Sequence, residues 1–449
     1  MIPPKPEGVT WTDDQWKAIM AGGQDILVAA AAGSGKTAVL VERMIKKITS
    51  TSNPIDVDEL LVVTFTNASA AEMRHRIAEA LEKAIDEDPS SGHLRKQLSL
   101  LNRASISTLH SFCLEVIRKY YYLIDIDPGF RIADETEAQL LRDEVIDELF
   151  EEEYGKPDNH PFYRLVDTFT NDRSDEALKD ILLDLYDFAK SNPSPEGYLE
   201  KIVKMYDVHH ELGFEELPFS NVLLFDVELQ LLGAKRLLDQ GLEITRMPEG
   251  PAPRAENFEQ DKHLIETLLS AKERSWNALY DAMQLVDFKR AKPCSPKQYD
   301  KDLIDKASKL RDKAKKMVLD LKAELFSRRP ESFLKDMFEM RDVIQTLANL
   351  VKEFDKKFAQ VKQEKGLVDF SDLEHFTLDI LSSGREAEQR MTPSEAGLAY
   401  RRKFKEVLVD EYQDTNMVQE AILRLVTADG ENNGNLFMVG DVKQSIVRP

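Results

Sequence analysis

The sequence predicts an α/β fold with a doubly wound parallel sheet and a large all-α domain inserted into it. Short runs of apolar and β-branched residues occur in the first and last parts of the chain, and most of them lead into helical patterns. This alternation is typical of a parallel sheet that is covered by helices on both faces. From about residue 125 to residue 366, long charged amphipathic stretches replace the strand-like runs.

Each apolar run has the length and composition of a buried strand. In chain order, the expected strands are 25–29, 60–66, 104–109, 406–410 and 435–440. Helical patterns follow most of them, and the expected helices are 38–45, 68–83, 110–122 and 417–427. In the middle of the chain, apolar residues recur at helical spacing over 133–153, 303–325 and 333–363.

Composition and charge describe a globular protein of about two to three domains. The 449 residues are 42% hydrophobic, and they contain neither a long uncharged apolar run nor a signal-peptide core, so we expect a cytoplasmic protein without a membrane segment. Cys113 and Cys294 are too few for a disulfide framework or a metal cluster, and we expect two reduced core thiols. The net charge of −21 argues against nonspecific coating of DNA but allows a local basic groove.

Residues 30–37, Ala-Ala-Ala-Gly-Ser-Gly-Lys-Thr, have the composition of a phosphate-binding loop and lie between an expected strand and an expected helix. Gly33 and Gly35 allow successive backbone N–H groups to turn toward an anion. Lys36 supplies positive charge, and the Thr37 hydroxyl is suited to ligate Mg²⁺. The strict pattern has Gly where this chain has Ala30. We predict a nucleoside triphosphate bound by Ala30, Ala31, Ala32, Gly33, Ser34, Gly35, Lys36 and Thr37.

Polar groups near other strands complete the predicted nucleotide site. Asp410 and Glu411 lie at the carboxyl end of the strand 406–410, where a doubly wound sheet binds its ligands. We expect Asp410 to hold Mg²⁺ and Glu411 to deprotonate the water that attacks the γ-phosphate. Gln444 is suited to sense the terminal phosphate through a neutral amide, and Gln15 is suited to contact adenine. The predicted catalytic residues are Lys36, Asp410, Glu411 and Gln444.

Seven segments, in order, resemble the motifs of superfamily 1 helicases of the UvrD/Rep type. They are Gln15, the loop 30–37, and the segments 64–74, 107–112, 369–373, 410–415 and 439–446. Within this family, the all-Ala start of the loop, the large helical insertion and the phrases 65–73 and 440–446 most resemble the AddA group, the helicase–nuclease subunits of bacterial AddAB recombination complexes. The family motif continues with a DNA-stacking Tyr where this chain has Val447, so we expect that contact to be lost or displaced.

The resemblance implies domains, ligands and partners. It implies a RecA-like motor domain 1A formed by 1–122 and 366–449, with a helical domain 1B at 123–365, whereas the second motor domain and the nuclease domain of such proteins are absent from these residues. The expected cofactors are ATP and Mg²⁺, and the expected partners are single-stranded DNA, double-stranded DNA ends and an AddB-like subunit in a heterodimer, with no membrane.

The resemblance also implies a path for single-stranded DNA, lined by Phe65, Thr66, Asn67, Thr108 and His110. Phe65 is suited to base stacking, which tolerates any sequence. Taken alone, the residues leave two other roles open, because Phe65 is also a suitable core residue and His110 is also placed to cap the helix that it opens.

These inferences predict the ATP-binding motor portion of a DNA helicase/exonuclease subunit that processes double-strand ends for recombinational repair and couples ATP hydrolysis to translocation on single-stranded DNA. Arginines of the second motor domain complete such sites, so we expect little turnover by these 449 residues alone. One alternative is a nonenzymatic module that binds ATP without productive turnover and docks onto a partner or onto DNA. A metabolic P-loop kinase explains neither the segment 64–73 nor Gln444.

Overall fold

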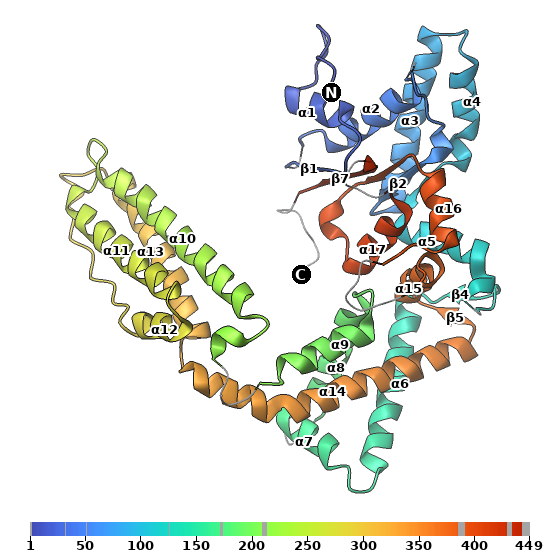
Figure 1. Cartoon of the computed structure of the whole chain (residues 1–449). Coiled ribbons are helices and arrows are strands. Elements are labelled where there is room, and N and C mark those ends of the chain that lie inside the picture. The colour runs from blue at the N-terminus through green and yellow to red at the C-terminus, as the bar shows by residue number, and fades with distance from the viewer. Residues whose placement is uncertain are drawn as a thin grey trace. The chain divides into compact units, whose positions relative to one another are not determined.

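The computed structural model describes residues 2–31, 33–50, 52–124, 126–170, 174–208, 213–384, 391–428 and 433–441 (Figure 1). The chain divides into two compact units. One unit comprises Met1–Leu199 and Asn349–Pro449, and the other comprises Glu200–Ala348. The first unit contains both sheets that the described residues form, and the second is helical.

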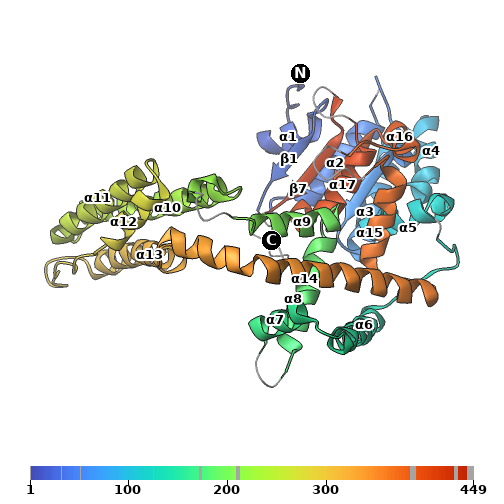
Figure 2. The same ribbon diagram turned by 60° about the horizontal axis from the view of Figure 1, so that its bottom comes forward.

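The larger sheet confirms the predicted parallel strands. Within the described residues it has five strands in the order β1-β7-β6-β2-β3, and every neighbouring pair is parallel. β1 and β7 lie side by side in both ribbon views (Figures 1 and 2). The strands are β1 (Ile26–Ala29), β2 (Leu60–Thr64), β3 (Ser105–Thr108), β6 (Glu406–Val409) and β7 (Leu436–Gly440).

Helices cover both faces of this sheet, and alternate side chains of each central strand pack on opposite faces. Leu60 and Val62 of β2 belong to the core formed with α1 to α4, whereas Leu61 and Val63 belong to the core formed with α5, α15, α16 and α17. In Figure 1, α2 and α3 lie above the sheet and α5, α15 and α17 lie below it. The helices are α1 (Asp13–Met20), α2 (Lys36–Ile48), α3 (Asn67–Glu87), α4 (Gly92–Leu100), α5 (Leu109–Tyr120), α15 (Phe370–Leu381), α16 (Glu395–Lys403) and α17 (Met417–Val426).

Between β4 (Arg131–Ile132) and β5 (Leu367–Val368), the described residues form helices joined by loops and no further strand. β4 and β5 pair in parallel as a second small sheet, so the two ends of this long helical stretch meet. The amphipathic stretches predicted at 133–153, 303–325 and 333–363 correspond to α6, α13 and α14. The helices are α6 (Glu135–Gly155), α7 (His160–Phe169), α8 (Glu176–Lys190), α9 (Pro195–Met205), α10 (Ser220–Thr245), α11 (Ala255–Lys272), α12 (Trp276–Gln284), α13 (Lys301–Leu325) and α14 (Pro330–Glu364).

The helical unit has its own hydrophobic core, centred on α10, α11 and α13. Gly241 of α10 lies against the ring of Phe258 of α11, and a Cβ atom at position 241 would come within 2.2 Å of that ring. A glycine is therefore needed at this crossing. Arg311 and Asp261 form a buried ion pair within the same unit, with Nε 2.6 Å from Oδ2.

A buried ion pair also joins α2 to the first residue of β6 in the larger sheet. Arg43 of α2 donates from Nε to Glu406 Oε1 of β6 at 2.5 Å, and both side chains are 3% exposed. The Arg43 guanidinium also donates to the carbonyl oxygens of Ala18 and Ala21, and it lies 4.4 Å from the centroid of the Phe437 ring of β7. One side chain thus joins α1, α2, β6 and β7.

The structure also bears on the expectations about the two cysteines and about membrane-spanning helices. Cys113 is buried, as predicted, but Cys294 is partly exposed in the loop before α13, so the prediction of a core thiol there is wrong. That loop packs too little apolar surface over the sulfur to exclude solvent. No described helix is long and apolar enough to cross a membrane.

We predict that Glu406→Leu lowers the free energy of unfolding by about 3–5 kcal/mol, because it leaves the buried Arg43 charge without its carboxylate. Urea unfolding followed by circular dichroism measures the loss. The control is Arg131→Ala, which removes an ion pair whose arginine side chain is 62% exposed, and it should change the stability far less than Glu406→Leu, because solvent screens an exposed pair. Equal losses in the two variants would contradict the importance assigned to the buried pair.

Candidate nucleotide and DNA sites

The phosphate-binding loop connects β1 directly to α2. Its first N–H, that of Ala30, donates to the Gly440 carbonyl at the end of β7, at 3.0 Å. Gly33 and Gly35 have φ angles of +74° and +82°, in the left-handed region that favours glycine. Gly35 caps α2 without any side chain, so no side chain occupies the N–H groups of the first helical turn. These groups and the helix dipole suit an anion. Ala32 lies outside the described residues.

Lys36 is the first residue of α2, and its side chain reaches the loop that follows β6. Its Nζ lies 3.2 Å from Glu411 Oε2, with the lysine side chain 9% exposed and the glutamate side chain 35% exposed. The predicted phosphate ligand and the predicted general base, 375 residues apart in the sequence, are therefore neighbours. Within the described residues, the buried hydroxyl of Ser34, two residues before Lys36, has no hydrogen-bond partner.

Asp410 and Glu411 differ in conformation and environment. The Asp410 N–H donates to Val63 O at 2.9 Å, which extends the pairing of β6 with β2, while Glu411 turns out of the sheet with φ +55°. Burial raises the pKa of Asp410, and the neighbouring charge of Glu411 raises it further, whereas the Glu411 N–H and Lys36 lower it. A buried carboxyl of this kind is suited to a divalent cation, which would stabilise its ionised form.

Gln413 is a site residue to which sequence reasoning gave no role. Its Nε2 donates to Glu411 Oε2 at 2.6 Å, and its Oε1 accepts from the N–H of Asp441 at 2.8 Å. The same Oε1 lies 2.6 Å from the position that a Cβ atom would take on Gly440. Gln413 therefore holds the Glu411 carboxylate and the end of β7 together. Its place within the motif 410–415 was the signal available in the sequence.

Gln15 lies against the phosphate-binding loop, but its amide bonds to protein groups in this structure. Its Oε1 accepts from the Thr12 N–H at 2.9 Å as part of the capping box of α1, and its Nε2 donates to Ser34 O at 2.9 Å. These bonds attach α1 to the loop, and the contact with adenine stays a prediction. Gln444 and Val447 lie outside the described residues.

The residues predicted to line a DNA path lie at the carboxyl ends of β2 and β3. The two strands pair with Thr64 opposite Thr108, so the segments that follow them leave the same edge of the sheet. Phe65 is 56% exposed, which excludes the alternative of a core residue. Thr66 accepts from Ser69 N and caps α3, and the next residue, Asn67, is exposed.

The second segment of this predicted path opens α5. Thr108 caps the helix by accepting from Ser111 N at 3.3 Å, so the alternative that gave the capping role to His110 is wrong. The His110 ring instead places Nε2 3.0 Å from Glu374 Oε1 of α15, and its side chain is 36% exposed. The structure therefore brings 65–67 and 108–110 to one edge of the sheet, the edge that also carries the nucleotide site.

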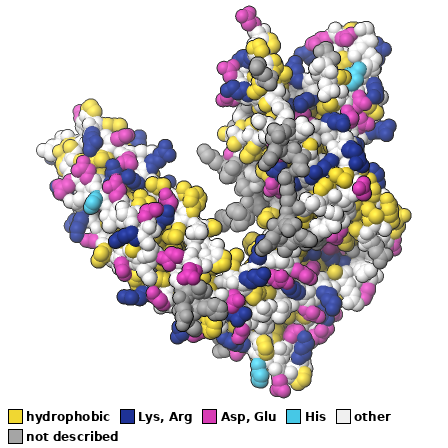
Figure 3. Space-filling view, in the orientation of Figure 1, with side chains coloured by type: hydrophobic (Ala, Val, Ile, Leu, Met, Phe, Trp, Pro, Cys, Tyr) yellow, Lys and Arg dark blue, Asp and Glu magenta, His cyan; other side chains and the backbone are white. Residues whose placement is uncertain are grey.

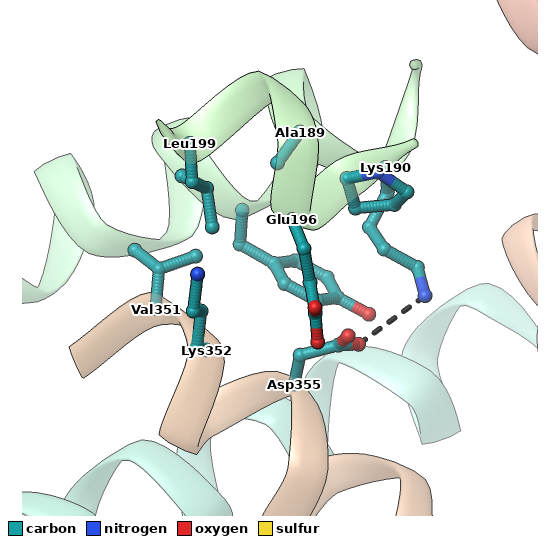
Figure 4. A pocket seen from close by; sticks show the side chains of 9 residues that line it. Ala189, Lys190, Glu196, Leu199, Val351, Lys352 and Asp355 are labelled. Carbon is teal, nitrogen blue, oxygen red and sulfur yellow. Dashed lines mark hydrogen bonds and ion pairs between the residues drawn. The ribbon is translucent and has the colours of Figure 1, made fainter. Parts of the chain in front are cut away.

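A cavity lies between α8, α9 and α14 (Figure 4). Tyr186, Lys190, Glu196 and Asp355 are among the residues that line it, and Lys190 pairs with Asp355 at 3.2 Å. Its volume is about 20 Å³, which is room for about one water molecule. It is too small to be an alternative nucleotide site.

Comparison with known proteins confirms the resemblance indicated by the seven motifs. The sequence profile of the UvrD/REP helicase N-terminal domain matches residues 11–448. The chain is 57% identical over 445 residues to an ATP-dependent helicase/nuclease subunit of Bacillus velezensis, and 58% identical over 444 residues to the corresponding protein of Bacillus licheniformis. Each alignment covers 99% of this chain and 36% of the relative, so the chain spans about a third of the length of these relatives. Because the family profile matches nearly every residue, the chain belongs to the UvrD/REP helicase N-terminal domain family.

Proposed function

We propose that this chain is the ATP-binding motor portion of a DNA helicase, in which ATP hydrolysis is coupled to translocation on single-stranded DNA. The observation that carries the proposal is the convergence of the phosphate-binding loop, Lys36 and the pair Asp410–Glu411 at one edge of the sheet, beside the exposed segment that begins at Phe65. The candidate nucleotide site and the candidate DNA path thus lie at the same edge of one sheet.

Residues of this chain supply groups suited to bind the phosphates and Mg²⁺ and to activate the attacking water. The N–H groups of the loop and of the first turn of α2 bind phosphate oxygens, and Lys36 neutralises the outer phosphates. Thr37 and Asp410 would hold Mg²⁺, which would supply Lewis-acid activation of the phosphate when bound. Glu411 orients and deprotonates the attacking water, while its bond to Gln413 fixes the direction of the carboxylate.

We propose the same assignment for the parts of the chain as for superfamily 1 motors. Residues 1–122 and 366–449 form motor domain 1A, and 123–365 form the inserted helical domain 1B. The pairing of β4 with β5 supports this proposal, because it brings the two ends of the helical stretch together close to the proposed boundaries. We further propose that this chain acts in the processing of double-strand DNA ends together with an AddB-like partner. The relatives are named helicase/nuclease subunits, and we assign the nuclease activity to the part of such proteins that this chain does not cover.

Surface charge is compatible with this proposal. Figure 3 shows acidic and basic side chains interleaved over the visible face. A chain with a net charge of −21 gains little from unspecific attraction to phosphates, so DNA contacts must come from particular groups. Exposed aromatic rings and helix N-termini at the sheet edge supply such groups.

The first test is Lys36→Ala. Removing a buried ammonium that contacts phosphate should weaken binding of a fluorescent ATP analogue in the presence of Mg²⁺ by about ten- to a hundredfold. Lys46→Ala removes the same charge from the same helix, where the side chain is 45% exposed and pairs with Glu42, and it should leave the affinity unchanged. Equal affinity of the Lys36→Ala variant and the unmodified chain would show that the site is placed wrongly.

The second test is Phe65→Ala. If this ring stacks on a base, its loss should weaken binding of a labelled oligothymidylate by about fivefold or more. Binding of the ATP analogue should not change. Phe225→Ala is the matched control, because Phe225 of α10 is 60% exposed but belongs to the helical unit. A loss of DNA affinity in the control alone, or in neither variant, would exclude Phe65 from the path.

A further inference from the structure

Glu374 of α15 is a buried carboxylate at the junction of three helices. The residue is 4% exposed, and both of its carboxylate oxygens have hydrogen-bond partners. Oε1 lies 3.0 Å from His110 Nε2 of α5 and 2.6 Å from Gln419 Nε2 of α17. Oε2 lies 3.2 Å from Nδ2 of Asn416, the N-cap of α17. The donors that the structure gives this carboxylate are thus two amides and one imidazole.

On one side, this carboxylate holds a residue of the candidate DNA path. The His110 ring also contacts the Phe370 ring, with centroids 5.0 Å apart, and both side chains are partly open to solvent. His110 lies two residues after Thr108, the last residue of β3, and so belongs to the candidate DNA path. A DNA strand that contacted the imidazole and displaced it would lengthen or break the hydrogen bond to Glu374.

On the other side, the same carboxylate holds the end of the catalytic loop. Only a short 3-10 turn, η6 (Tyr412–Asp414), and Thr415 separate Glu411 from Asn416. The turn is closed by the bonds Asp414 N to Glu411 O at 3.0 Å and Thr415 N to Tyr412 O at 3.1 Å. Asn416 also caps α17 through its Oδ1, which accepts from Gln419 N at 2.7 Å. A displacement of Asn416 would therefore be transmitted to Glu411 through this hydrogen-bonded turn.

We propose that Glu374 is a positioning residue that couples occupancy of the DNA path at His110 to the position of Glu411 in the nucleotide site. The inference rests on the proposed function and deepens it, because it names the connection between the two ligands. Coupling of this kind is a free energy shared by two sites, so each ligand must change the affinity for the other by the same factor. That reciprocity can be measured without turnover.

The experiment measures the affinity of the 449-residue chain for a labelled oligothymidylate with and without Mg²⁺ and a nonhydrolysable ATP analogue. In the unmodified chain, the two affinities should differ by about fivefold or more. In Glu374→Gln, which keeps the size of the side chain but loses its charge, each ligand should still bind alone while the ratio of affinities falls toward one. A purely structural role would lower the melting temperature without changing the ratio.

Glu153→Gln is the matched control. Glu153 of α6 is another buried carboxylate, and it accepts from an amide, that of Asn159, at 2.7 Å and from Lys156 at 2.5 Å. It touches neither site, so this variant should keep the ratio of the unmodified chain. Asn416→Ser is a second test variant, because it keeps an oxygen for capping α17 and removes only the amide donor to Glu374. It should also bring the ratio toward one.

The possible outcomes separate the two proposals. If both ligands bind but the ratio is one in the unmodified chain, or stays unchanged in Glu374→Gln and Asn416→Ser, the coupling role of Glu374 is wrong and the proposed function stands. If the unmodified chain does not bind the ATP analogue, the proposed function fails and the inference fails with it. If Glu374→Gln does not fold, Asn416→Ser decides the question.

Discussion

The parallel pairing of β1, β7 and β6 is the constraint on which both candidate sites depend. The carboxyl ends of parallel strands meet at one edge, so the loops that follow Ala29 and Val409 must leave the sheet on either side of the end of β7 at Gly440. The backbone bond from Ala30 to Gly440 extends this pairing into the phosphate-binding loop itself. Beneath the edge, the buried pair of Arg43 and Glu406 fixes α2 to β6. The distance between Lys36 and Glu411 therefore follows from the sheet and not from local loop structure.

Within this frame, the direction of the Glu411 carboxylate is set by backbone strain and by side chains together. A left-handed conformation is uncommon for a residue with a Cβ atom, and holding one costs about 1–3 kcal/mol. At Glu411 this conformation turns the chain sharply out of β6. Lys36 and Gln413 then both donate to the same carboxylate oxygen, Oε2, at 3.2 and 2.6 Å. Strain at this residue supports the role that we propose for Glu411, since a general base must be held in one direction.

The strands and the phosphate-binding loop could be predicted because their signals are local. Strands of a parallel sheet are buried on both faces, so β2 and β6 read as continuous apolar runs. Glu374 could not be found in the same way, since its role arises from bonds between segments far apart in the sequence, such as the one to His110, 264 residues away. Gln413 lies inside a recognised motif, but its bond to Asp441 is visible only in the fold. The pattern of residue types within one segment gives no sign of such a contact. The prediction for Cys294 failed for a different reason. A small apolar residue near a helical stretch is typical of a core, but Cys294 lies in a loop and is partly exposed.

If the proposed function is right, the position of the candidate DNA path would explain how so acidic a chain binds a polyanion. Thr66 and Thr108 cap α3 and α5, so two helices begin at the carboxyl edge of β2 and β3. Helix N-termini carry partial positive charge that attracts phosphate without a single basic side chain. Stacking on Phe65 adds affinity that does not depend on charge or on sequence. Under the proposed function, a DNA strand bound through helix dipoles and stacking, instead of through many lysines, would be released easily at each step of translocation.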